Sequence, residues 1–412
     1  MQAASGTTTR HQPESGLSRT TTLIFAIAAG LSVANIYYAQ PLLGAIARDF
    51  GISLGAIGLV VTLTQVGYAL GLVFIVPLGD LLDRRRLIVS QGVLSIIALV
   101  AVATARTEWV LFTGLAAMGL LAVVVQVLVA FAATLATPAE RGRAVGMVTS
   151  GVVIGILAAR CVAGLLADVG GWRAVYLTSA VMTAAMVGLL MRVLPHNPLP
   201  GSTESYAGTL RSIPILFLRD RVLLVRGLLA LLIFATFSTF WTSLVLPLST
   251  VPFNYSHTQI GLFGLVGVAG AAAATGAGRL ADHGLGQCMT AVSLALLLLS
   301  WGLIAFLPSS IPLLLIGVIL LDLTVQAVHV TNQSIILGRY PKARSRLVGG
   351  YMVFYSIGSA IGAGAATMAY GHAGWRGVSM LGAAFSATAL LTWAGTRHLP
   401  IGSETMECVD GL

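Results

Sequence analysis

The chain has 412 residues, of which 57% are hydrophobic and only 9% are charged. Soluble domains carry about 25% charged residues, so this composition excludes a soluble globular protein of this size. The net charge is +9, but it comes from arginines scattered over many short segments, with Lys342 as the single lysine, so we expect no nucleic-acid partner.

Apolar runs of about 20 residues, the length of helix that crosses a bilayer, recur along the whole chain. The first nineteen residues are polar and lack the apolar core of a signal peptide, so we expect the first span to stay in the membrane. The sequence therefore predicts an all-α membrane protein with twelve transmembrane helices. Their predicted ranges are 21–43, 55–79, 87–105, 109–136, 144–167, 172–194, 222–249, 259–281, 287–307, 311–338, 347–370 and 375–396.

The segment between the sixth and seventh spans is longer than the other connections and contains Pro195, Pro198, Pro200 and Pro214. This composition is typical of a linker between two halves. The predicted parts are a cytoplasmic tail (1–20), a six-helix bundle (21–194), a cytoplasmic linker (195–221), a second six-helix bundle (222–396) and a cytoplasmic tail (397–412).

Positively charged residues indicate the orientation of the spans. If both termini are cytoplasmic, most of the 23 Lys and Arg residues fall in cytoplasmic segments. Only Arg48, Arg106, Arg173 and Arg376 then face outward. Because basic residues accumulate on the cytoplasmic side, we expect a multi-pass membrane protein with both termini in the cytoplasm.

The two halves of the chain carry matching residues at a constant spacing. The segment Gly171–Arg173 recurs as Gly374–Arg376, and Gly155 matches Gly358 at the same offset of 203 residues. A parallel repeat of two six-helix units is one of the architectures that support alternating access, with the substrate site between the repeats. The sequence therefore predicts two pseudo-symmetric six-helix bundles.

A short charged segment follows the second span of each half. In the first half it runs from Pro77 to Arg86, and a similar segment in the second half runs from Gly278 to Gly284. A carboxylate at a helix end can bind N–H groups or arginines of a neighbouring helix and so hold one conformation closed. The alternative is that the arginines only follow the positive-inside rule. The residues assigned to this cytoplasmic gating loop are Asp80, Asp83, Arg84, Arg85, Arg86 and Asp282.

The charged loop, its counterpart in the second half and the twelve-span repeat resemble those of the major facilitator superfamily over nearly the whole chain. The opening segment Asn35–Leu43 is similar to that of bacterial members grouped with drug and metabolite exporters. The family loop reads Gly-x-Leu-x-Asp-Arg-x-Gly-Arg-Arg, and two registers fit: one matches its front with Asp83 as the family acid, and the other matches its back with Asp80. We favour Asp80, because only Asp80 matches Asp282 in the repeat; Leu81 and Asp83 then replace the arginine and the glycine of the family loop. The resemblance implies a transporter of the bacterial inner membrane that works as a monomer.

Polar residues within the predicted spans are costly and therefore mark candidate functional sites. Asp322, Gln326, His329 and Gln333 are spaced so that they form one stripe along the tenth helix. A stripe of this kind has to face the protein interior or a water-filled cavity. A buried structural network is the alternative interpretation.

Arg160 is the one arginine expected deep within a span, because Arg226 lies near a helix end from which its side chain can reach the interface. Helices five and ten run in opposite directions, and Arg160 and Asp322 fall at a similar depth. We therefore predict that these two charges pair, directly or through water, in at least one conformation. Arg160 also replaces a proline found in many family antiporters, so the motif does not establish proton antiport.

Further candidates are polar or amphipathic residues in apolar spans, because tyrosine and tryptophan can stack on a ligand and form one hydrogen bond. Simple packing is the alternative for each of them. The candidates outside the proposed pathway are Gln40, Gln65, Tyr68, Tyr351 and Tyr355. The predicted substrate and proton pathway comprises Asp322, Gln326, His329, Arg160, Asn35, Tyr38, Gln126 and Trp241.

The sequence favours a secondary transporter that exports small organic molecules in exchange for protons, with Asp322 and His329 as the buried proton carriers. One alternative is an importer or facilitator of a polar or anionic metabolite such as a sugar or an organic acid. Another is a membrane receptor that has lost transport. No nucleotide loop, metal cluster or nucleophile-base motif is present in the sequence, so we expect neither an enzyme nor a cofactor. The expected partners are a small-molecule substrate, protons and the lipid bilayer.

Overall fold

The computed structural model describes residues 18–137, 140–195, 206–273, 286–339 and 344–399, and these residues form helices without a β-strand. The helices of the first half are α1 (Arg19–Tyr37), η1 (Gln40–Leu42), α2 (Leu43–Phe50), α3 (Leu59–Phe74), η2 (Val76–Asp80), α4 (Arg84–Ala103), α5 (Glu108–Leu121), α6 (Val124–Leu135) and α7 (Arg141–Val193). Those of the second half are α8 (Tyr206–Arg219), α9 (Arg221–Ser243), α10 (Val245–Leu248), α11 (His257–Ala273), α13 (Gly286–Ile304), α14 (Ile311–Arg339) and α15 (Arg344–Thr396).

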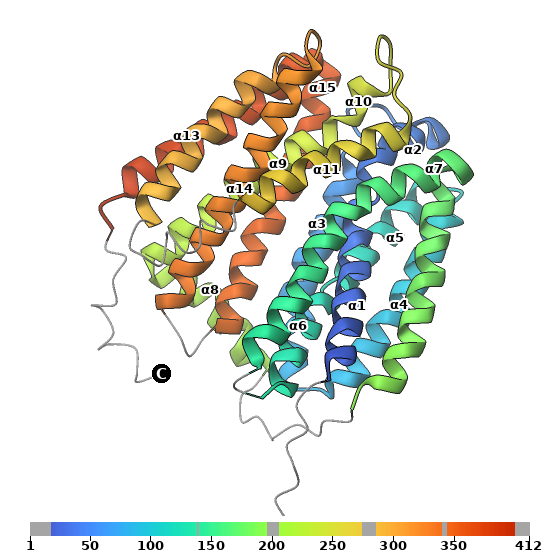
Figure 1. The fold of residues 1–412 in the computed structure, drawn as a ribbon, viewed down its shortest axis with the longest axis vertical. Coiled ribbons are helices and arrows are strands. Elements are labelled where there is room, and N and C mark those ends of the chain that lie inside the picture. Colours follow the sequence, from blue (N-terminus) through green and yellow to red (C-terminus); the bar gives the residue numbers. More distant parts are fainter. Residues whose placement is uncertain (1–17, 138–139, 196–205, 274–285, 340–343, 400–412) are drawn as a thin grey trace, which may run out of the picture.

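The described residues include eight helical segments that are long and apolar enough to cross a membrane, and α7 and α15 are among them. These two helices have 53 residues each, and each turns back at a glycine with positive φ, 76° at Gly171 and 59° at Gly374 (Figure 1). Glycine adopts this backbone conformation without steric cost, so two spans can follow each other with no loop. Together with the shorter α3 and α11, these helices account for the twelve predicted spans.

Part of the predicted linker is helical. The prolines of range 195–221 indicate an irregular connection, but α8 forms within it and contains Pro214. Phe217 of α8 is buried, and its ring lies 5.4 Å from that of Phe354 on α15. Packing against the second bundle therefore outweighs the loss of a helical hydrogen bond at the proline, and local composition does not reveal that contribution.

Helices α1 to α7 form the first bundle and α9 to α15 form the second (Figure 1). The most extensive contacts within the bundles join α1 to α7 and α9 to α15. The bundles meet at the end of the molecule that carries α2, α10 and the turn of α7, and they diverge toward the end at which α1 begins (Figure 1). We call these the junction end and the divergent end.

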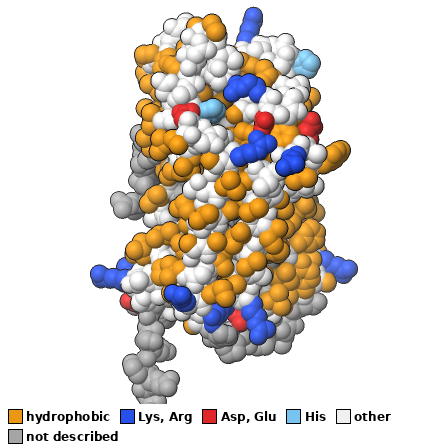
Figure 2. Space-filling view, turned by 90° about the vertical axis from the view of Figure 1, so that its right-hand side faces the viewer, with side chains coloured by type: hydrophobic (Ala, Val, Ile, Leu, Met, Phe, Trp, Pro, Cys, Tyr) orange, Lys and Arg blue, Asp and Glu red, His pale blue; other side chains and the backbone are white. Residues whose placement is uncertain are grey.

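The surface between the two ends is largely apolar, whereas charged side chains gather near the ends (Figure 2). For example, Ile97 of α4 is 60% exposed, and Ile154, in the part of α7 before its turn, is 64% exposed. A continuous apolar surface of this size is unfavourable in water and is matched by the hydrocarbon core of a bilayer. The fold is that of an all-α membrane protein.

Gly155 and Gly358, which match in the sequence repeat, also occupy matching positions in the structure. A Cβ atom at Gly155 would lie 2.3 Å from the carbonyl oxygen of Gly30 on α1. A Cβ atom at Gly358 would lie 2.0 Å from the carbonyl oxygen of Leu231 on α9. In each bundle, the glycine lets the fifth helix contact the backbone of the first, as small residues do in membrane helix pairs.

We expect Gly358→Leu to lower the melting temperature of the purified protein, because the added side chain would force α15 away from α9. Overpacking of this kind costs about 1–3 kcal/mol or more. The matched control is Gly349→Leu on the same helix, where a Cβ atom would meet nothing within 4 Å. Equal melting temperatures for the two variants would contradict the close contact at Gly358.

Candidate functional site

Side chains from both bundles surround Arg160, which lies on α7 before the turn at Gly171. Arg160 is only 3% exposed, and its Nε donates to Oε1 of Gln40 in η1 at 2.8 Å. Its guanidinium carbon lies 4.1 Å from the centre of the Trp241 ring on α9, in the other bundle. A desolvated cation over an indole face gains about 2 kcal/mol, so this contact helps to hold the two bundles together.

Asp322 on α14 approaches the same indole ring. Its Oδ1 accepts a hydrogen bond from Nε1 of Trp241 at 3.2 Å, and the residue is 5% exposed. Its other oxygen packs on Gly267 of α11, where a Cβ atom would lie 1.9 Å from Oδ2, so a glycine is needed there to leave room for the carboxylate. Trp241 is therefore in contact with both a buried cation and a buried anion.

The structure brings Arg160 and Asp322 together around Trp241 rather than into direct contact. The two charges attract each other electrostatically. However, the distance between the nitrogens of Arg160 and the carboxylate oxygens of Asp322 exceeds 4.0 Å, the limit for an ion pair, in the part of the chain that the structure describes. A direct or water-mediated pair in another conformation stays a prediction. We call Arg160, Gln40, Trp241 and Asp322 the charge cluster.

Aromatic side chains lie next to the charge cluster on the side of the divergent end. The hydroxyl groups of Tyr37 on α1 and Tyr355 on α15 contact each other across the two bundles. The ring of Tyr355 lies 4.0 Å from that of Phe234 on α9. We call Tyr37, Tyr355 and Phe234 the aromatic layer; its contacts join α1 of the first bundle to α9 and α15 of the second.

His329 lies two turns beyond Asp322 on α14 and also points inward. Its Nδ1 is 3.0 Å from the hydroxyl of Tyr351, and its ring packs edge-on against Phe234 at 5.2 Å. Gln326, between them on the stripe, is half-buried. Asp322 and His329 thus contact protein groups rather than lipid, although their predicted transport roles stay predictions.

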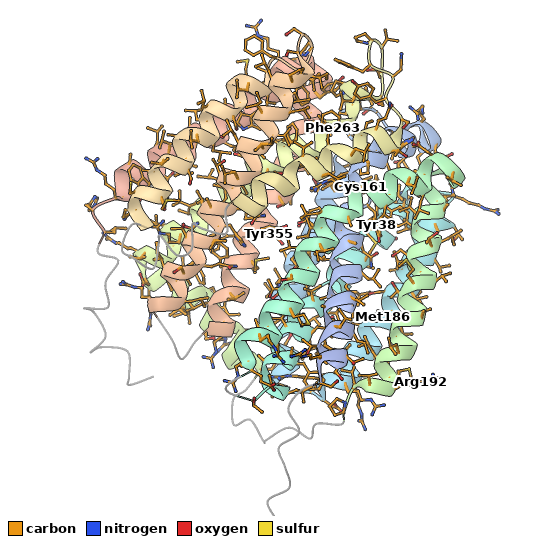
Figure 3. All side chains as sticks on the ribbon, in the orientation of Figure 1. Tyr38, Cys161, Met186, Arg192, Phe263 and Tyr355 are labelled. Carbon is orange, nitrogen blue, oxygen red and sulfur yellow. The ribbon has the colours of Figure 1, made fainter. Side chains whose placement is uncertain are left out.

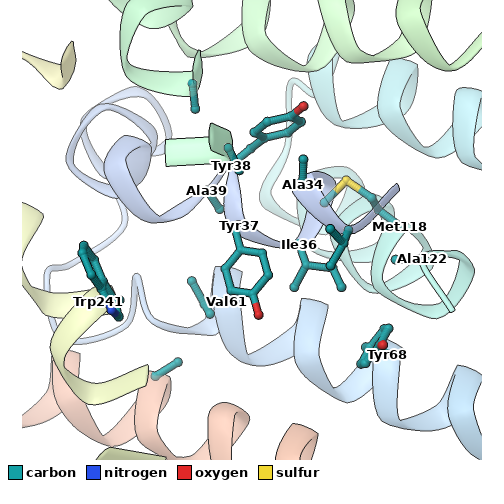
Figure 4. Close-up of a cluster of buried hydrophobic side chains, with 14 of the residues drawn as sticks. Ala34, Ile36, Tyr37, Tyr38, Ala39, Val61, Tyr68, Met118, Ala122 and Trp241 are labelled. Carbon is teal, nitrogen blue, oxygen red and sulfur yellow. The ribbon is translucent and has the colours of Figure 1, made fainter. Parts of the chain in front are cut away.

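Asn35 and Tyr38 lie inside the first bundle, apart from the charge cluster. Oδ1 of Asn35 accepts from Oγ of Ser179 at 2.7 Å, and the side chain of Tyr38 is buried in the same bundle. Tyr37 and Tyr38 point to different sides of α1 (Figure 4). Gln126 donates to the hydroxyl of Tyr68 at 3.3 Å, again within the first bundle. Of the other candidates from the sequence, Trp241 and Gln40 join Arg160 and Asp322 in the charge cluster, whereas Asn35, Tyr38 and Gln126 do not.

Asp168 forms a connection between the bundles that sequence reasoning missed. Its Oδ1 accepts from the backbone N–H of His257 at 3.1 Å and lies 2.9 Å from the Nδ1 of the same residue. Its Oδ2 accepts from the backbone N–H of Thr258 at 2.8 Å. The first N–H groups of a helix lack partners within it, so Asp168 caps α11 from the opposite bundle. The sequence signal for this contact was the carboxylate at the end of the fifth span together with the polar residues at the start of the eighth.

Close backbone packing continues from Asp168 along α7 and α11. A Cβ atom at Gly164 would lie 2.2 Å from the carbonyl oxygen of His257, and Sγ of Cys161 lies 3.1 Å from that of Gly261. Figure 3 shows Cys161 on α7 and Phe263 on α11 near this contact. These helices approach so closely because glycines face each other at the interface.

A second contact between the bundles joins α15 to the start of α3. Oγ1 of Thr367 donates to the carbonyl oxygen of Gly55 at 3.1 Å and accepts from the N–H of Gly58 at 3.2 Å. The hydroxyl of Thr62 donates to the carbonyl oxygen of Ala360 at 3.0 Å. With the α7–α11 contact, this second contact closes the junction end.

In the gating loop, Asp83 caps α4. Its Oδ1 accepts from the backbone N–H of Arg85 at 2.9 Å, and its Oδ2 lies 3.9 Å from the exposed Arg86. The side chain of Arg85 donates to the carbonyl oxygen of Met191 on α7 at 2.5 Å. These contacts lie within the first bundle and stabilise the start of α4.

Arg84 also contacts its own bundle, since its Nε donates to the carbonyl oxygen of Gly79 at 2.8 Å. The side chain of Asp80 and the whole of Asp282 lie outside the described residues. Their predicted role in closing the cytoplasmic side therefore stays a prediction.

Arg226 is buried, which corrects the expectation that it reaches the membrane interface. It is 3% exposed, and its Nη1 donates to Oγ1 of Thr290 and Oδ1 of Asn332, both at 3.1 Å. Its Nη2 donates to Oε1 of Gln287 at 3.3 Å. The side chain turns inward because three neutral acceptors on α13 and α14 replace the water that it would otherwise seek. Arg226 therefore joins α9 to α13 and α14.

Two helix bundles with buried charges at their interface are the architecture of membrane transporters that work by alternating access. The chain matches the family model of the Major Facilitator Superfamily over residues 25–304 and 228–405. It therefore belongs to the major facilitator superfamily, as the sequence resemblance predicted.

Known relatives agree with this assignment. The chain is 47% identical to the putative uncharacterized transporter YgaY of Escherichia coli (strain K12) over 93% of this chain and 97% of that protein. It is 24% identical to a probable sugar efflux transporter of Pasteurella multocida (strain Pm70) over 60% of each chain. A crystal structure of a bacterial homolog of the human lysosomal transporter Spinster, in an inward-facing and occupied conformation, matches with a TM-score of 0.75 at 14% identity, over 91% of this chain and 95% of that chain. The protein is a transporter and not an enzyme.

Proposed function

We propose that this protein is a proton-coupled secondary transporter of small organic molecules and that Asp322 carries the proton. The observation that supports this proposal best is the charge cluster, because it crosses the interface between the bundles. Arg160 belongs to the first bundle, whereas Trp241 and Asp322 belong to the second. A change of charge at Asp322 therefore alters the attraction between the two bundles beside the contacts that close the junction end.

The coupling follows from the cost of buried charge. While Asp322 is ionised, its charge offsets that of Arg160, and the two bundles attract each other. Protonation removes this attraction and leaves a buried cation without a counter-charge, which costs several kcal/mol in a medium of low dielectric constant. The junction end then opens more easily, so proton binding and the conformational change are linked.

The distribution of basic residues supports an orientation in which the divergent end faces the cytoplasm. Arg19 begins α1 at this end. Arg84, Arg141 and Arg346 lie near the starts of α4, α7 and α15, and Arg192 lies near the end of α7, which returns to the divergent end. By the positive-inside rule, this distribution supports cytoplasmic positions for both termini, in the inner membrane of a bacterium. We propose that the protein works there as a monomer, since the charge cluster lies between the bundles of one chain.

Two directions of transport are consistent with the fold. Export is supported by the relative described as a probable sugar efflux transporter, and we propose that it occurs in exchange for protons. Uptake or facilitated passage of a polar or anionic metabolite is supported by the buried positive charge of Arg160. The two differ in coupling, because an exchanger requires substrate and proton to compete, whereas an importer requires them to bind together.

The test is transport by the purified full chain in liposomes with a pH gradient of either sign. The probes are cationic dyes, labelled sugars and labelled small acids, and a pH-sensitive dye inside the vesicles follows the protons. We expect the gradient to drive at least one probe, with proton movement in proportion. If every transported probe only equilibrates, and its rate is independent of the gradient, the protein is a facilitator and the proposal fails.

A further inference from the structure

We infer that the substrate is an organic anion whose carboxylate binds Arg160 and whose flat apolar part packs on the aromatic side chains around it. This inference rests on the proposed transport function and names the substrate class of the same site. Neither the family membership nor the relatives' descriptions assign a role to this arginine.

The first observation is an unused hydrogen-bond donor. Nη2 of Arg160 is buried and has no hydrogen-bond partner among the residues that the structure describes, whereas Nε of the same side chain donates to Gln40. An unpaired donor on a buried guanidinium costs free energy, so its presence inside a membrane protein indicates that the donor binds an acceptor in another conformation. Guanidinium groups bind carboxylates through two parallel hydrogen bonds, and a carboxylate is therefore the matching acceptor.

The second observation is the surface that Arg160 shares with aromatic rings. The guanidinium carbon lies 4.1 Å from the ring centre of Trp241, 5.2 Å from that of Tyr37 and 5.7 Å from that of Phe237. These rings come from both bundles. A ligand with a planar apolar part can stack on them while its charged end reaches Arg160.

The third observation is the charge balance. Arg160 and Asp322 are the two oppositely charged groups of the cluster, and the other titratable groups that face them are Tyr37, Tyr355 and Cys161. With Asp322 ionised, the site has no net charge, and an incoming anion would be repelled by the aspartate. With Asp322 protonated, the site carries the single positive charge of Arg160, and an anion would neutralise it. Protonation of Asp322 therefore raises the affinity for the anion, and the bound anion raises the affinity for the proton by the same factor.

The same balance disfavours a cation. A cationic substrate would have to approach Arg160 in either protonation state, and burial of like charges is costly. The geometry therefore selects the second of the two candidate directions, in which the proton accompanies the substrate and an inward proton gradient drives uptake.

The site is closed in the conformation described. A hollow of about 10 Å³ lies against Arg160 and Trp241, bounded by Gln40, Leu244 and Ile260. This is room for a water molecule but not for a carboxylic acid. In the proposed cycle, the anion therefore reaches Arg160 only after the bundles move, when the junction end opens.

The experiment uses three ring compounds of the same shape and different charge: benzoate, benzamide and benzamidine. Binding of each to the purified full chain is measured by equilibrium binding and by the shift in melting temperature, from pH 5 to pH 8. We expect benzoate to bind, with an affinity that rises as the pH falls, and benzamidine not to bind. Similar affinity for all three compounds would overturn the inference.

Two variants make the test specific. Arg160→Gln should weaken benzoate binding about 30-fold or more, as removal of one partner of a buried charge pair does. Arg143→Gln, an exposed arginine on the same helix, is the matched control. Asp322→Asn mimics the protonated acid and should bind benzoate with an affinity that no longer depends on pH. If Arg160→Gln does not fold, unchanged pH dependence in Asp322→Asn would still overturn the inference.

Failure of this inference can be told apart from failure of the proposed function. If a pH gradient drives another probe but benzoate does not bind, only the substrate class is wrong. If benzoate binds as expected but no gradient drives any probe, the site stands and the proton-coupled function is wrong.

Discussion

Asp322→Asn is expected to abolish the response of transport to a pH gradient while downhill exchange of substrate remains measurable. Asparagine keeps an oxygen that can accept from Nε1 of Trp241, so the local packing survives. It cannot release or take up a proton, so the carrier no longer couples the two movements. Loss of a positioned proton-transfer group typically slows such steps by about 100-fold or more, and we expect a loss of this size in gradient-driven transport.

The measurement is substrate and proton flux in liposomes, with and without the gradient. Glu108→Gln, the same change of acid to amide at the exposed first turn of α5, serves as the control and should transport like the wild type. If Asp322→Asn still concentrated substrate in response to the gradient, the proton would have to be carried elsewhere, with His329 as the next candidate.

The second large effect is expected for Gly164→Leu, which should hold the junction end apart and stop transport. A Cβ atom at Gly164 would lie 2.2 Å from the carbonyl oxygen of His257, so a leucine cannot fit while α7 and α11 are in contact. The variant can still fold, because this contact lies between the bundles rather than within one. A transporter confined to one side of its cycle cannot release substrate on the other.

The distance between spin labels at Val169 and Val251 reports the opening, since both residues are highly exposed and belong to different bundles at the junction end. We expect a longer distance in Gly164→Leu than in Gly146→Leu, whose added side chain would meet nothing within 4 Å on the same helix. Equal distances, together with equal transport, would show that the α7–α11 contact does not control closure.

The spans and the repeat could be predicted from the sequence because they depend on local properties. Long apolar runs specify helices in a bilayer whatever their neighbours are, and glycines at equivalent positions mark both the turns and the close helix contacts. The inward direction of Asp322 and His329 could be predicted for a similar reason, since a lipid-facing position would be prohibitively costly.

The features that could not be predicted depend on residues far apart in the chain. Nothing near Arg226 in the sequence indicates the three neutral acceptors on α13 and α14 that bury it. Trp241 was a candidate for ligand stacking, but its position between Arg160 and Asp322 requires three helices to be placed in space. Asp168 binds a helix that begins almost ninety residues later, as the spacing to His257 shows.

The cap that Asp168 forms on α11 limits how strongly the α7–α11 contact is held. Asp168 and His257 are 28% and 26% exposed in their side chains, so water can replace each bond as it breaks. Because water can hydrogen-bond the same groups when the cap breaks, its release costs little free energy compared with the loss of a buried charge pair. Under the proposed coupling, the contact that controls the conformational change is the charge cluster about two turns deeper on α7, where water cannot compensate for a lost charge.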